Sequence, residues 1–171
     1  MKGYVQVYTG DGKGKTTAAL GLSLRAAGAG LRVYICQFMK SGDYSEIKAL
    51  KYFSDLIIVE QFGTGKFIKG KPAPEEIEAG QKGLARLKQA VAGSDFDVVI
   101  AEEANVAVLC GLFPVSELIH IIDTKPENTE LVITGRGAAP EVIDRADLVT
   151  EMQAVKHYYE NGVQARTGIE K

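Results

Sequence analysis

Short apolar runs alternate with longer amphipathic runs along the chain, and this alternation predicts an α/β fold. The apolar runs predict strands at Tyr4–Tyr8, Leu31–Phe38, Leu56–Glu60, Asp97–Ala101, Glu130–Thr134 and Asp147–Met152. Helical patterns lie between several of them, at Thr16–Ala29, Pro74–Ala92, Pro114–Asp123 and Pro140–Ala146. The strands are almost continuously apolar, as is typical of a parallel sheet that helices cover on both faces. We therefore expect one domain over residues 1–171, a three-layer α/β fold whose mostly parallel sheet binds a ligand at the carboxyl ends of its strands.

Composition and charge exclude several classes of partner. Of the 171 residues, 46% are hydrophobic and 25% are charged, which is ordinary for a globular protein. The net charge is −2 and no long basic run is present, so we expect no nucleic acid partner. No apolar run approaches the roughly 20 residues that cross a bilayer, and no signal sequence precedes the first strand. We expect a cytoplasmic protein without a membrane partner, in which Cys36 and Cys110 are small core residues and not a redox pair.

The most informative motif is the run from residue 8 to residue 17, Tyr-Thr-Gly-Asp-Gly-Lys-Gly-Lys-Thr-Thr. It follows a predicted strand and opens a predicted helix, which is the arrangement of a P-loop. The backbone N–H groups of such a loop bind phosphate, Lys15 contacts phosphate oxygens, and the Thr16 hydroxyl binds Mg²⁺. The candidate nucleotide-binding residues are Thr9, Gly10, Asp11, Gly12, Lys13, Gly14, Lys15, Thr16 and Thr17.

One position departs from the general P-loop pattern. The pattern G-x-x-x-x-G-K-[ST] requires a glycine where this chain has Thr9, and glycines instead alternate with Asp11 and Lys13. We expect a loop shaped differently from that of a common ATPase, with Lys13 as an extra cation beside the phosphates. The alternative is a glycine-rich turn that binds nothing, and the strand before it and the helix after it argue against that.

Acidic residues follow the predicted strand at Asp97–Ala101. P-loop proteins usually hold an acidic residue at such a strand end to organise Mg²⁺, so Glu102 is the candidate metal ligand beside Thr16. Glu103 would either share this role or accept a hydrogen bond from the substrate, and Asn105 is the next polar group on this edge. A solvated strand end is the alternative interpretation.

Two more strand ends carry candidate ligands. Arg136 lies between glycines in Thr134-Gly-Arg-Gly137, where its fork of donors could bind phosphate oxygens, although a turn with a solvated arginine is the alternative. Gln37 and Lys40 follow the second strand and offer an amide and a cation on the same edge. His157 pairs with no recognisable nucleophile or metal ligand, so we do not expect it to be a general base. A chain rich in phosphate-binding groups but without an evident nucleophile indicates chemistry in which one substrate attacks another.

Together these motifs resemble the P-loop family of ATP:corrinoid adenosyltransferases, which implies a P-loop NTPase (RecA-like) fold. The resemblance covers essentially the whole chain, and threonine at the position of Thr9 is usual in that family. The matching stretches are Thr9–Thr17, Arg25-Ala-Ala-Gly28, Gln37-Phe-Met-Lys40, Glu102-Glu103 with Asn105, Thr134-Gly-Arg-Gly137, Ala146-Asp147, Lys156-His157 and Gly162–Glu170.

The resemblance implies a transferase that moves the 5′-deoxyadenosyl group of ATP to Co(I) of a reduced corrinoid and releases triphosphate, in cobalamin biosynthesis or salvage. It implies that Lys13, Lys15, Glu103 and Arg136 are catalytic, with Mg²⁺ (Mn²⁺ as the alternative) on Thr16 and Glu102. A reduced flavin or a flavodoxin-like protein would supply the electrons, and the family implies a homodimer. A small P-loop kinase or ATPase that cleaves at phosphorus and a non-catalytic corrinoid carrier are the alternatives.

Three features depart from the family pattern. The acidic pair is Glu102-Glu103, where Asp-Glu is frequent. The chain has no tryptophan, so Phe67, with Phe62 behind it, is the candidate aromatic against the corrin ring. Phe67 lies in Gly63–Ala73, a run with three glycines and three lysines that predicts a mobile loop near the site. No extension precedes the first strand to cover the corrinoid, so we expect an open corrin site or one completed by a partner subunit.

Overall fold

The computed structural model describes residues 1–170, so Lys171, the last residue of the predicted domain, lies outside the described residues. The strands are β1 (Val5–Thr9), β2 (Val33–Phe38), β3 (Ile57–Phe62), β4 (Val98–Glu102), β5 (Glu130–Thr134) and β6 (Leu148–Glu151). The helices are α1 (Lys15–Gly28), α2 (Ser45–Leu50), α3 (Pro74–Ala92), α4 (Ala104–Leu109), α5 (Val115–Thr124) and α6 (Pro140–Arg145). Short 3₁₀ turns, η1 (Lys51–Phe53) and η2 (Tyr158–Asn161), follow α2 and β6.

The strands of residues 1–170 form one six-stranded sheet in the order β3-β2-β4-β5-β1-β6, and every neighbouring pair is parallel. Strand β5 therefore separates β1, which leads into the P-loop, from β4, which ends at Glu102. Because all strands run in one direction, the loops that follow them meet at a single edge of the sheet. The predicted α/β class with a parallel sheet is confirmed.

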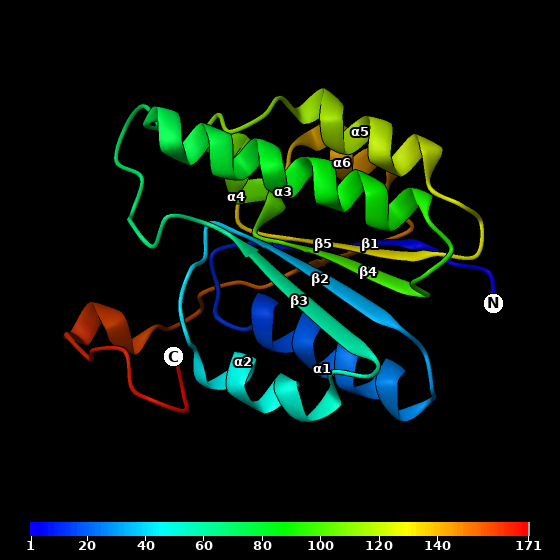
Figure 1. Ribbon diagram of the computed structural model, residues 1–171. Coiled ribbons are helices and arrows are strands. Elements are labelled where there is room, and N and C mark those ends of the chain that lie inside the picture. The colour runs from blue at the N-terminus through cyan, green and yellow to red at the C-terminus, as the bar shows by residue number, and fades with distance from the viewer. Residues whose placement is uncertain (171) are drawn as a thin grey trace.

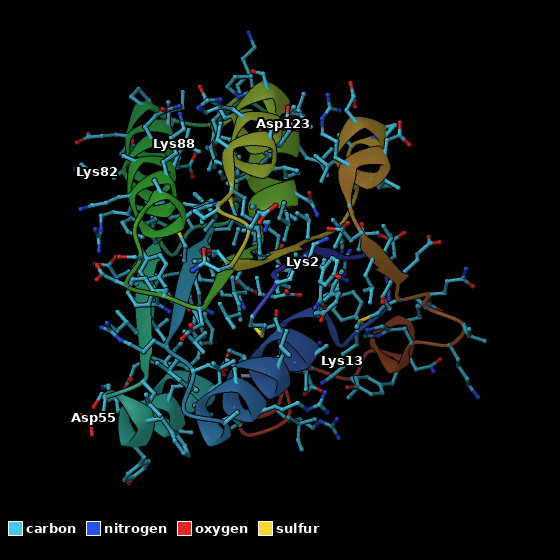
Figure 2. All side chains as sticks on the ribbon, turned by 90° about the vertical axis from the view of Figure 1, so that its right-hand side faces the viewer. Lys2, Lys13, Asp55, Lys82, Lys88 and Asp123 are labelled. Atoms are coloured by element: carbon cyan, nitrogen blue, oxygen red, sulfur yellow. The ribbon has the colours of Figure 1, made fainter. Side chains whose placement is uncertain are left out.

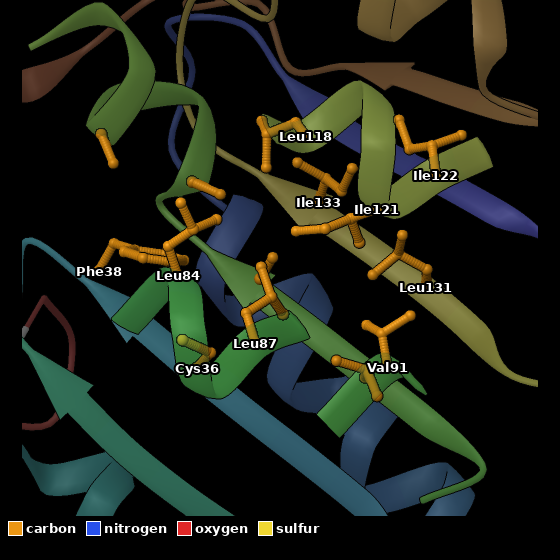
Figure 3. Packing of buried hydrophobic residues seen from close by; sticks show 14 of the residues in the cluster. Cys36, Phe38, Leu84, Leu87, Val91, Leu118, Ile121, Ile122, Leu131 and Ile133 are labelled. Atoms are coloured by element: carbon orange, nitrogen blue, oxygen red, sulfur yellow. The ribbon is translucent and has the colours of Figure 1, made fainter. Parts of the chain in front are cut away.

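Helices cover both faces of the sheet, as a three-layer fold requires (Figure 1). Helices α1 and α2 lie on one face, and α3, α4, α5 and α6 lie on the other (Figure 1). Two apolar clusters fill the two interfaces between the sheet and its helix layers. In the larger cluster, Ile121 of α5 lies beside Leu131 and Ile133 of β5, and Leu84 and Leu87 of α3 belong to the same cluster (Figure 3). Apolar residues buried on both faces explain why the strands appear in the sequence as continuous apolar runs.

Helix α3 shows how local sequence sets an element's start. Pro74 occupies the first helical turn, where its missing N–H has no partner to lose. The Ala73 N–H donates to Glu76 Oε2 at 2.7 Å. A side chain of the first turn therefore gives a hydrogen-bond partner to the backbone N–H of the residue before the helix. The prediction that Pro74 and Pro140 open helices is confirmed, whereas Pro114 precedes α5 as its N-cap and lies outside the helix.

Two segments lie near the carboxyl edge of the sheet besides the P-loop. The 63–73 loop joins β3 to α3 without regular structure, as predicted. Residues 152–170 leave β6 and return on the side of α1, where the C-terminal end lies near α2 (Figure 1). None of the helices within residues 1–170 is both long and apolar enough to cross a membrane.

Candidate functional site

The P-loop connects β1 to α1, and its glycines let it pass close to the segment that follows β6. A Cβ atom on Gly10 or Gly12 would lie 2.5 or 2.7 Å from the carbonyl oxygen of Met152. The Gly12 N–H donates to that same oxygen at 2.6 Å. Gly14 caps α1 with a φ of 125°, a conformation that favours glycine. The unusual glycine spacing therefore has a structural cause, which is the approach of a second backbone segment.

Thr9, at the position where the general motif has glycine, connects the P-loop to the segment after β5. Its side chain is buried, and its Oγ1 accepts a hydrogen bond from the Ala138 N–H at 3.2 Å. The Gly135 N–H in turn donates to the carbonyl of Tyr8 at 3.1 Å. These contacts hold the loop that carries Arg136 against the P-loop.

Lys15 is the most buried cation of the site. Its Nζ donates to the carbonyl oxygens of Gly10 at 2.6 Å and Gly12 at 2.8 Å, so its charge lies within the P-loop. Burial lowers the pKa of Lys15, the nearby Arg136 lowers it further, and Glu103 and Asp11 act in the opposite direction. The ammonium is therefore desolvated and lies beside a second cation, which favours an anionic ligand between them.

Glu102 at the end of β4 meets the first turn of α1. The Thr16 hydroxyl donates to Glu102 Oε1 at 2.5 Å, and Lys40 Nζ donates to the same oxygen at 3.0 Å. The side chain of Glu102 is fully buried, and its Oε2 has no hydrogen-bond partner among the described residues. The structure thus brings the two predicted metal ligands together.

A divalent cation fits this pair on the chemistry of its donors. A hydroxyl and a carboxylate are oxygen ligands of the kind that Mg²⁺ prefers, and Mg²⁺ keeps most of its coordination for water and phosphate. The unpartnered, buried Oε2 of Glu102 is an acceptor that a cation or its water would satisfy. Within residues 1–170 no group of three or more His, Cys, Asp and Glu side chains forms an all-protein metal site.

Glu103 holds its backbone in a conformation unusual for a residue with a side chain. Its φ is 60°, in the left-handed region, and its N–H donates to Thr134 Oγ1 at 3.0 Å. Burial raises the pKa of Glu103, the adjacent Glu102 raises it further, and Lys40, Lys15 and Arg136 oppose the shift. The strained turn aims this carboxyl at the cavity while Glu102 stays behind it.

These groups line a cavity of about 600 Å³ at the carboxyl edge of the sheet. Its wall combines the P-loop with two cations from other parts of the chain, Lys40 after β2 and Arg136 after β5. The C-terminal segment closes the wall beside Lys13. The predicted residues that line it are Gly12, Lys13, Gly14, Lys15, Thr16, Thr17, Lys40, Glu103 and Arg136. A cavity of this size and charge suits a nucleoside triphosphate.

Five further predicted residues, Gly10, Asp11, Gln37, Phe67 and Asn105, do not line the cavity. Gln37 and Asn105 are buried next to the strand ends, behind the cavity wall, and Asn105 Nδ2 donates to the Gly135 carbonyl at 3.4 Å. Asp11 is on the exposed side of the P-loop and Gly10 is beneath it. Phe67 is 94% exposed and is not among the residues that line the cavity. The side chain of Phe62 is partly buried against the core.

Sequence reasoning missed the C-terminal wall of the cavity. Lys13 Nζ donates to the carbonyl of Ile169 at 2.8 Å and lies 3.3 Å from Glu170 Oε1. Figure 2 shows Lys13 between the start of α1 and this returning segment. Arg166 and the hydroxyl of Tyr158 also donate to Glu170, and these donors hold the pKa of its carboxyl well below the usual range. The motif Gly162–Glu170 was visible in the sequence, but nothing in it indicated that its partner would be Lys13.

His157 also lines the cavity, at the start of η2. Its Nδ1 accepts a hydrogen bond from the Tyr159 N–H at 3.2 Å, which caps the 3₁₀ turn. Its described contacts are those of a residue that shapes the C-terminal segment.

Comparison with solved structures identifies the fold. The chain resembles a crystal structure of the RadB recombinase with a TM-score of 0.59, covering 91% of this chain and 77% of that one at 13% identity. The RecA-like P-loop fold is therefore confirmed, and at this identity the likeness extends to the fold alone.

Comparison of sequences identifies the family. The corrinoid adenosyltransferase of Pseudomonas aeruginosa is 31% identical over 99% of this chain and 84% of its own length. The corrinoid adenosyltransferase CobA of Salmonella typhimurium is 31% identical over 99% of this chain and 86% of its own length. The profile of the family described as ATP:corrinoid adenosyltransferase BtuR/CobO/CobP matches residues 1–170. This chain, with its cation-lined P-loop cavity, belongs to the ATP:corrinoid adenosyltransferase family.

Proposed function

We propose that this chain transfers the 5′-deoxyadenosyl group of ATP to Co(I) of a reduced corrinoid and releases triphosphate. The observation that carries the proposal is the convergence of Lys13, Lys15, Lys40 and Arg136 on one cavity at the P-loop. Such a wall suits a leaving group that bears several negative charges. Membership of the adenosyltransferase family supports the same reaction.

The step needs no nucleophile from the protein. The electron pair of Co(I) forms a bond to C5′ of the ribose as the bond between C5′ and its phosphate oxygen breaks. The electrons of that bond leave on triphosphate, cobalt becomes Co(III), and no proton is transferred. The protein would therefore act by positioning both substrates and by stabilising the charge that develops on triphosphate.

Each cation has a distinct part in this scheme. Lys15 lies inside the P-loop and would bind the phosphate nearest the loop backbone, while Arg136 could contact two phosphate oxygens with its fork of donors. Lys13 would join them after exchanging Glu170 for phosphate. The carboxyl of Glu103 would accept a hydrogen bond from the nucleotide and help to orient it. Thr16 and Glu102 would hold Mg²⁺ or Mn²⁺, which when bound neutralises part of the triphosphate charge.

The electrons that produce Co(I) would come from outside the chain. Burial strongly raises the pKa of Cys36, and this thiol donates to the Gly83 carbonyl inside the core, so it is not placed to act as a reductant. We propose a reduced flavin or a flavodoxin-like protein as the donor. We also propose a cytoplasmic enzyme, where ATP is available, acting as a homodimer.

The corrinoid would lie near the 63–73 loop, with Phe67 against the ring. Phe67 is exposed and follows β3, whose carboxyl end lies on the same edge as the P-loop. A large apolar ring on an exposed loop offers contact area to a flat ligand.

An anaerobic assay tests the proposal. Chemically reduced corrinoid, ATP and Mg²⁺ are mixed with the protein, and the cobalt absorbance is followed before and after exposure to light. We expect a photolabile alkyl-corrinoid whose formation requires both ATP and protein. Tight binding of both substrates without a carbon–cobalt bond would replace the proposal with a corrinoid carrier. Formation of ADP with the corrinoid unaltered would replace it with a kinase or ATPase.

A further inference from the structure

Three polar side chains lie in one row across the α1 face of the sheet, at its carboxyl end. Gln61 of β3 pairs in register with Gln37 of β2, and Gln37 pairs in register with Glu102 of β4. The residues two positions earlier, Val59, Ile35 and Ile100, all belong to the apolar cluster under α1. Because side chains alternate along a strand, the row continues that cluster toward the metal-binding carboxylate.

The hydrogen bonds in this row all run from donor to acceptor in the same direction, from Gly42 toward Gln37. The Gly42 N–H can only donate, and it donates to Gln61 Oε1 at 3.1 Å. The amide of Gln61 is thereby oriented so that its Nε2 donates to Gln37 Oε1 at 3.0 Å. The amide of Gln37 accepts from the β3 side, so its Nε2 is turned away from β3.

Two buried atoms at the end of the row remain unpartnered among the described residues. They are Gln37 Nε2, a donor, and Glu102 Oε2, an acceptor. Both side chains are fully buried on neighbouring strands. Buried polar groups without partners are costly, and a donor beside an acceptor is the complement that each needs. Because Gln37 and Glu102 are register partners on adjacent strands, their side chains are neighbours, and a direct hydrogen bond or one bridging water would satisfy both atoms.

We propose that Gln61 is a positioning residue for the metal site, which it serves by holding Gln37 as the hydrogen-bond donor to Glu102 Oε2. Thr16 of α1 and Lys40 of the loop after β2 hold the other oxygen of this carboxylate. The amide row holds it from the side of β2 and ties it to the loop after β2 through Gly42. The inference rests on the proposed role of Glu102 as a metal ligand. Gln61 itself is not among the residues that line the cavity.

The substitution Gln61→Glu separates this arrangement from simple charge attraction. The two side chains have nearly the same shape, but a carboxylate cannot donate to Gln37 Oε1. The Gln37 amide would turn its Nε2 toward the new carboxylate and its oxygen toward Glu102, placing acceptor against acceptor. Coulomb attraction alone would make Gln61→Glu bind a divalent cation more tightly, since it adds a negative charge. The amide row predicts that Gln61→Glu binds the cation more weakly.

The experiment measures the dissociation constant of Mn²⁺ from the electron paramagnetic resonance signal of the free ion, with ATP present and no corrinoid, so that no turnover occurs. We expect Gln61→Glu and Gln61→Met to weaken Mn²⁺ binding about tenfold, as the loss of a partner that orients a metal ligand commonly does. The control is Gln89→Glu, which adds the same charge on the exposed side of α3 and should leave Mn²⁺ binding unchanged. Thermal unfolding of each variant verifies that it is folded.

The outcomes distinguish failure of the amide row from failure of the metal site. If Glu102→Gln weakens Mn²⁺ binding while Gln61→Glu leaves it unchanged or tightens it, the amide row is overturned and the metal site stands. If Glu102→Gln itself has no effect on Mn²⁺ binding, the metal site is overturned and the role of Gln61 with it. Weakening by Glu102→Gln and by both Gln61 variants supports the proposal.

Discussion

The two halves of the proposed active site are built differently. The nucleotide half is buried and connected: Lys15 is held by P-loop carbonyls, and Glu102 by Thr16 and Lys40. The proposed corrinoid half is a loop without regular structure, whose aromatic Phe67 is 94% exposed. The first half is organised by the fold itself, whereas the second depends on side chains that have few neighbours.

This difference indicates where each property of the enzyme resides. Substitutions in the nucleotide half should reduce the rate with every corrinoid, because they change the stabilisation of triphosphate. Substitutions in the 63–73 loop should change the use of corrinoid and leave ATP binding intact.

Lys15→Ala should reduce adenosyl transfer at least about 100-fold, because it removes a preorganised charge from the leaving group. The rate is measured in the anaerobic assay at saturating ATP, so that weaker binding does not account for the loss. Lys82→Ala, which removes an exposed lysine of α3, is the matched control and should be neutral (Figure 2). Near-normal turnover by Lys15→Ala would remove the P-loop from the chemistry.

Phe67→Ala should raise the KM for corrinoid roughly fivefold to tenfold, as the loss of one aromatic contact predicts. The KM for ATP should not change, since Phe67 is outside the nucleotide cavity. Phe53→Ala, at an exposed aromatic in the turn after α2, is the control. An unchanged KM for corrinoid would exclude Phe67 from the corrin site.

Glu170→Gln should tighten ATP binding, because Lys13 would lose its ion pair and be free to bind phosphate. The gain should be only about twofold to threefold, because ion pairs at a protein surface contribute little free energy. Isothermal titration calorimetry at low and high salt measures the effect, which should shrink as salt increases. Glu160→Gln in η2 removes a nearby charge without touching Lys13 and serves as the control. Weaker ATP binding by Glu170→Gln would show that the C-terminal segment supports the nucleotide and does not compete with it.

Glu103→Gln should raise the melting temperature by a few degrees at neutral pH. Burial and Glu102 raise the pKa of Glu103 in the folded protein, so the folded state binds this proton more tightly than the unfolded state does. Its contribution to the free energy of unfolding is therefore most favourable below the ordinary glutamate pKa, and it is lost as the pH rises through the raised pKa. Between pH 4 and pH 8, the melting temperature should decline less with rising pH in Glu103→Gln than in the unsubstituted protein. An identical pH dependence in both proteins would contradict the shift.

Much of this molecule could be predicted from its sequence because its central strands β2, β4 and β5 are buried on both faces and are rich in apolar residues. The predicted strand at Glu130–Thr134 has the bounds of β5, and the other five strands are displaced by one or two residues at one or both ends. Helices α2 and α4 were not predicted, since each has six residues, too few to show a helical period. The equally short α6 was predicted because it begins with a proline. The pairing of Thr16 with Glu102 followed from the motif and from the rule that strand ends meet at one edge.

The contacts that could not be predicted join residues far apart in sequence through geometry alone. Glu170 reaches Lys13 only because the chain returns past α1 after β6. Gln61 was overlooked because its role depends on the register between β3, β2 and β4. That register places Gln61 beside Gln37, which lies between Gln61 and Glu102. The glycine spacing of the P-loop was noticed, but its cause required the position of Met152.

The identity of the phosphate product separates adenosyl transfer from cleavage at phosphorus. In adenosyl transfer, the cations of the P-loop cavity would stabilise an intact triphosphate while the bond at C5′ breaks. ATP labelled at the γ-phosphate is therefore incubated anaerobically with protein, Mg²⁺ and Co(I) corrinoid, and the labelled species are separated. We expect the label to leave in triphosphate, in an amount equal to the alkyl-corrinoid formed. Label in orthophosphate, with ADP and an unaltered corrinoid, would show that the protein cleaves ATP at phosphorus instead.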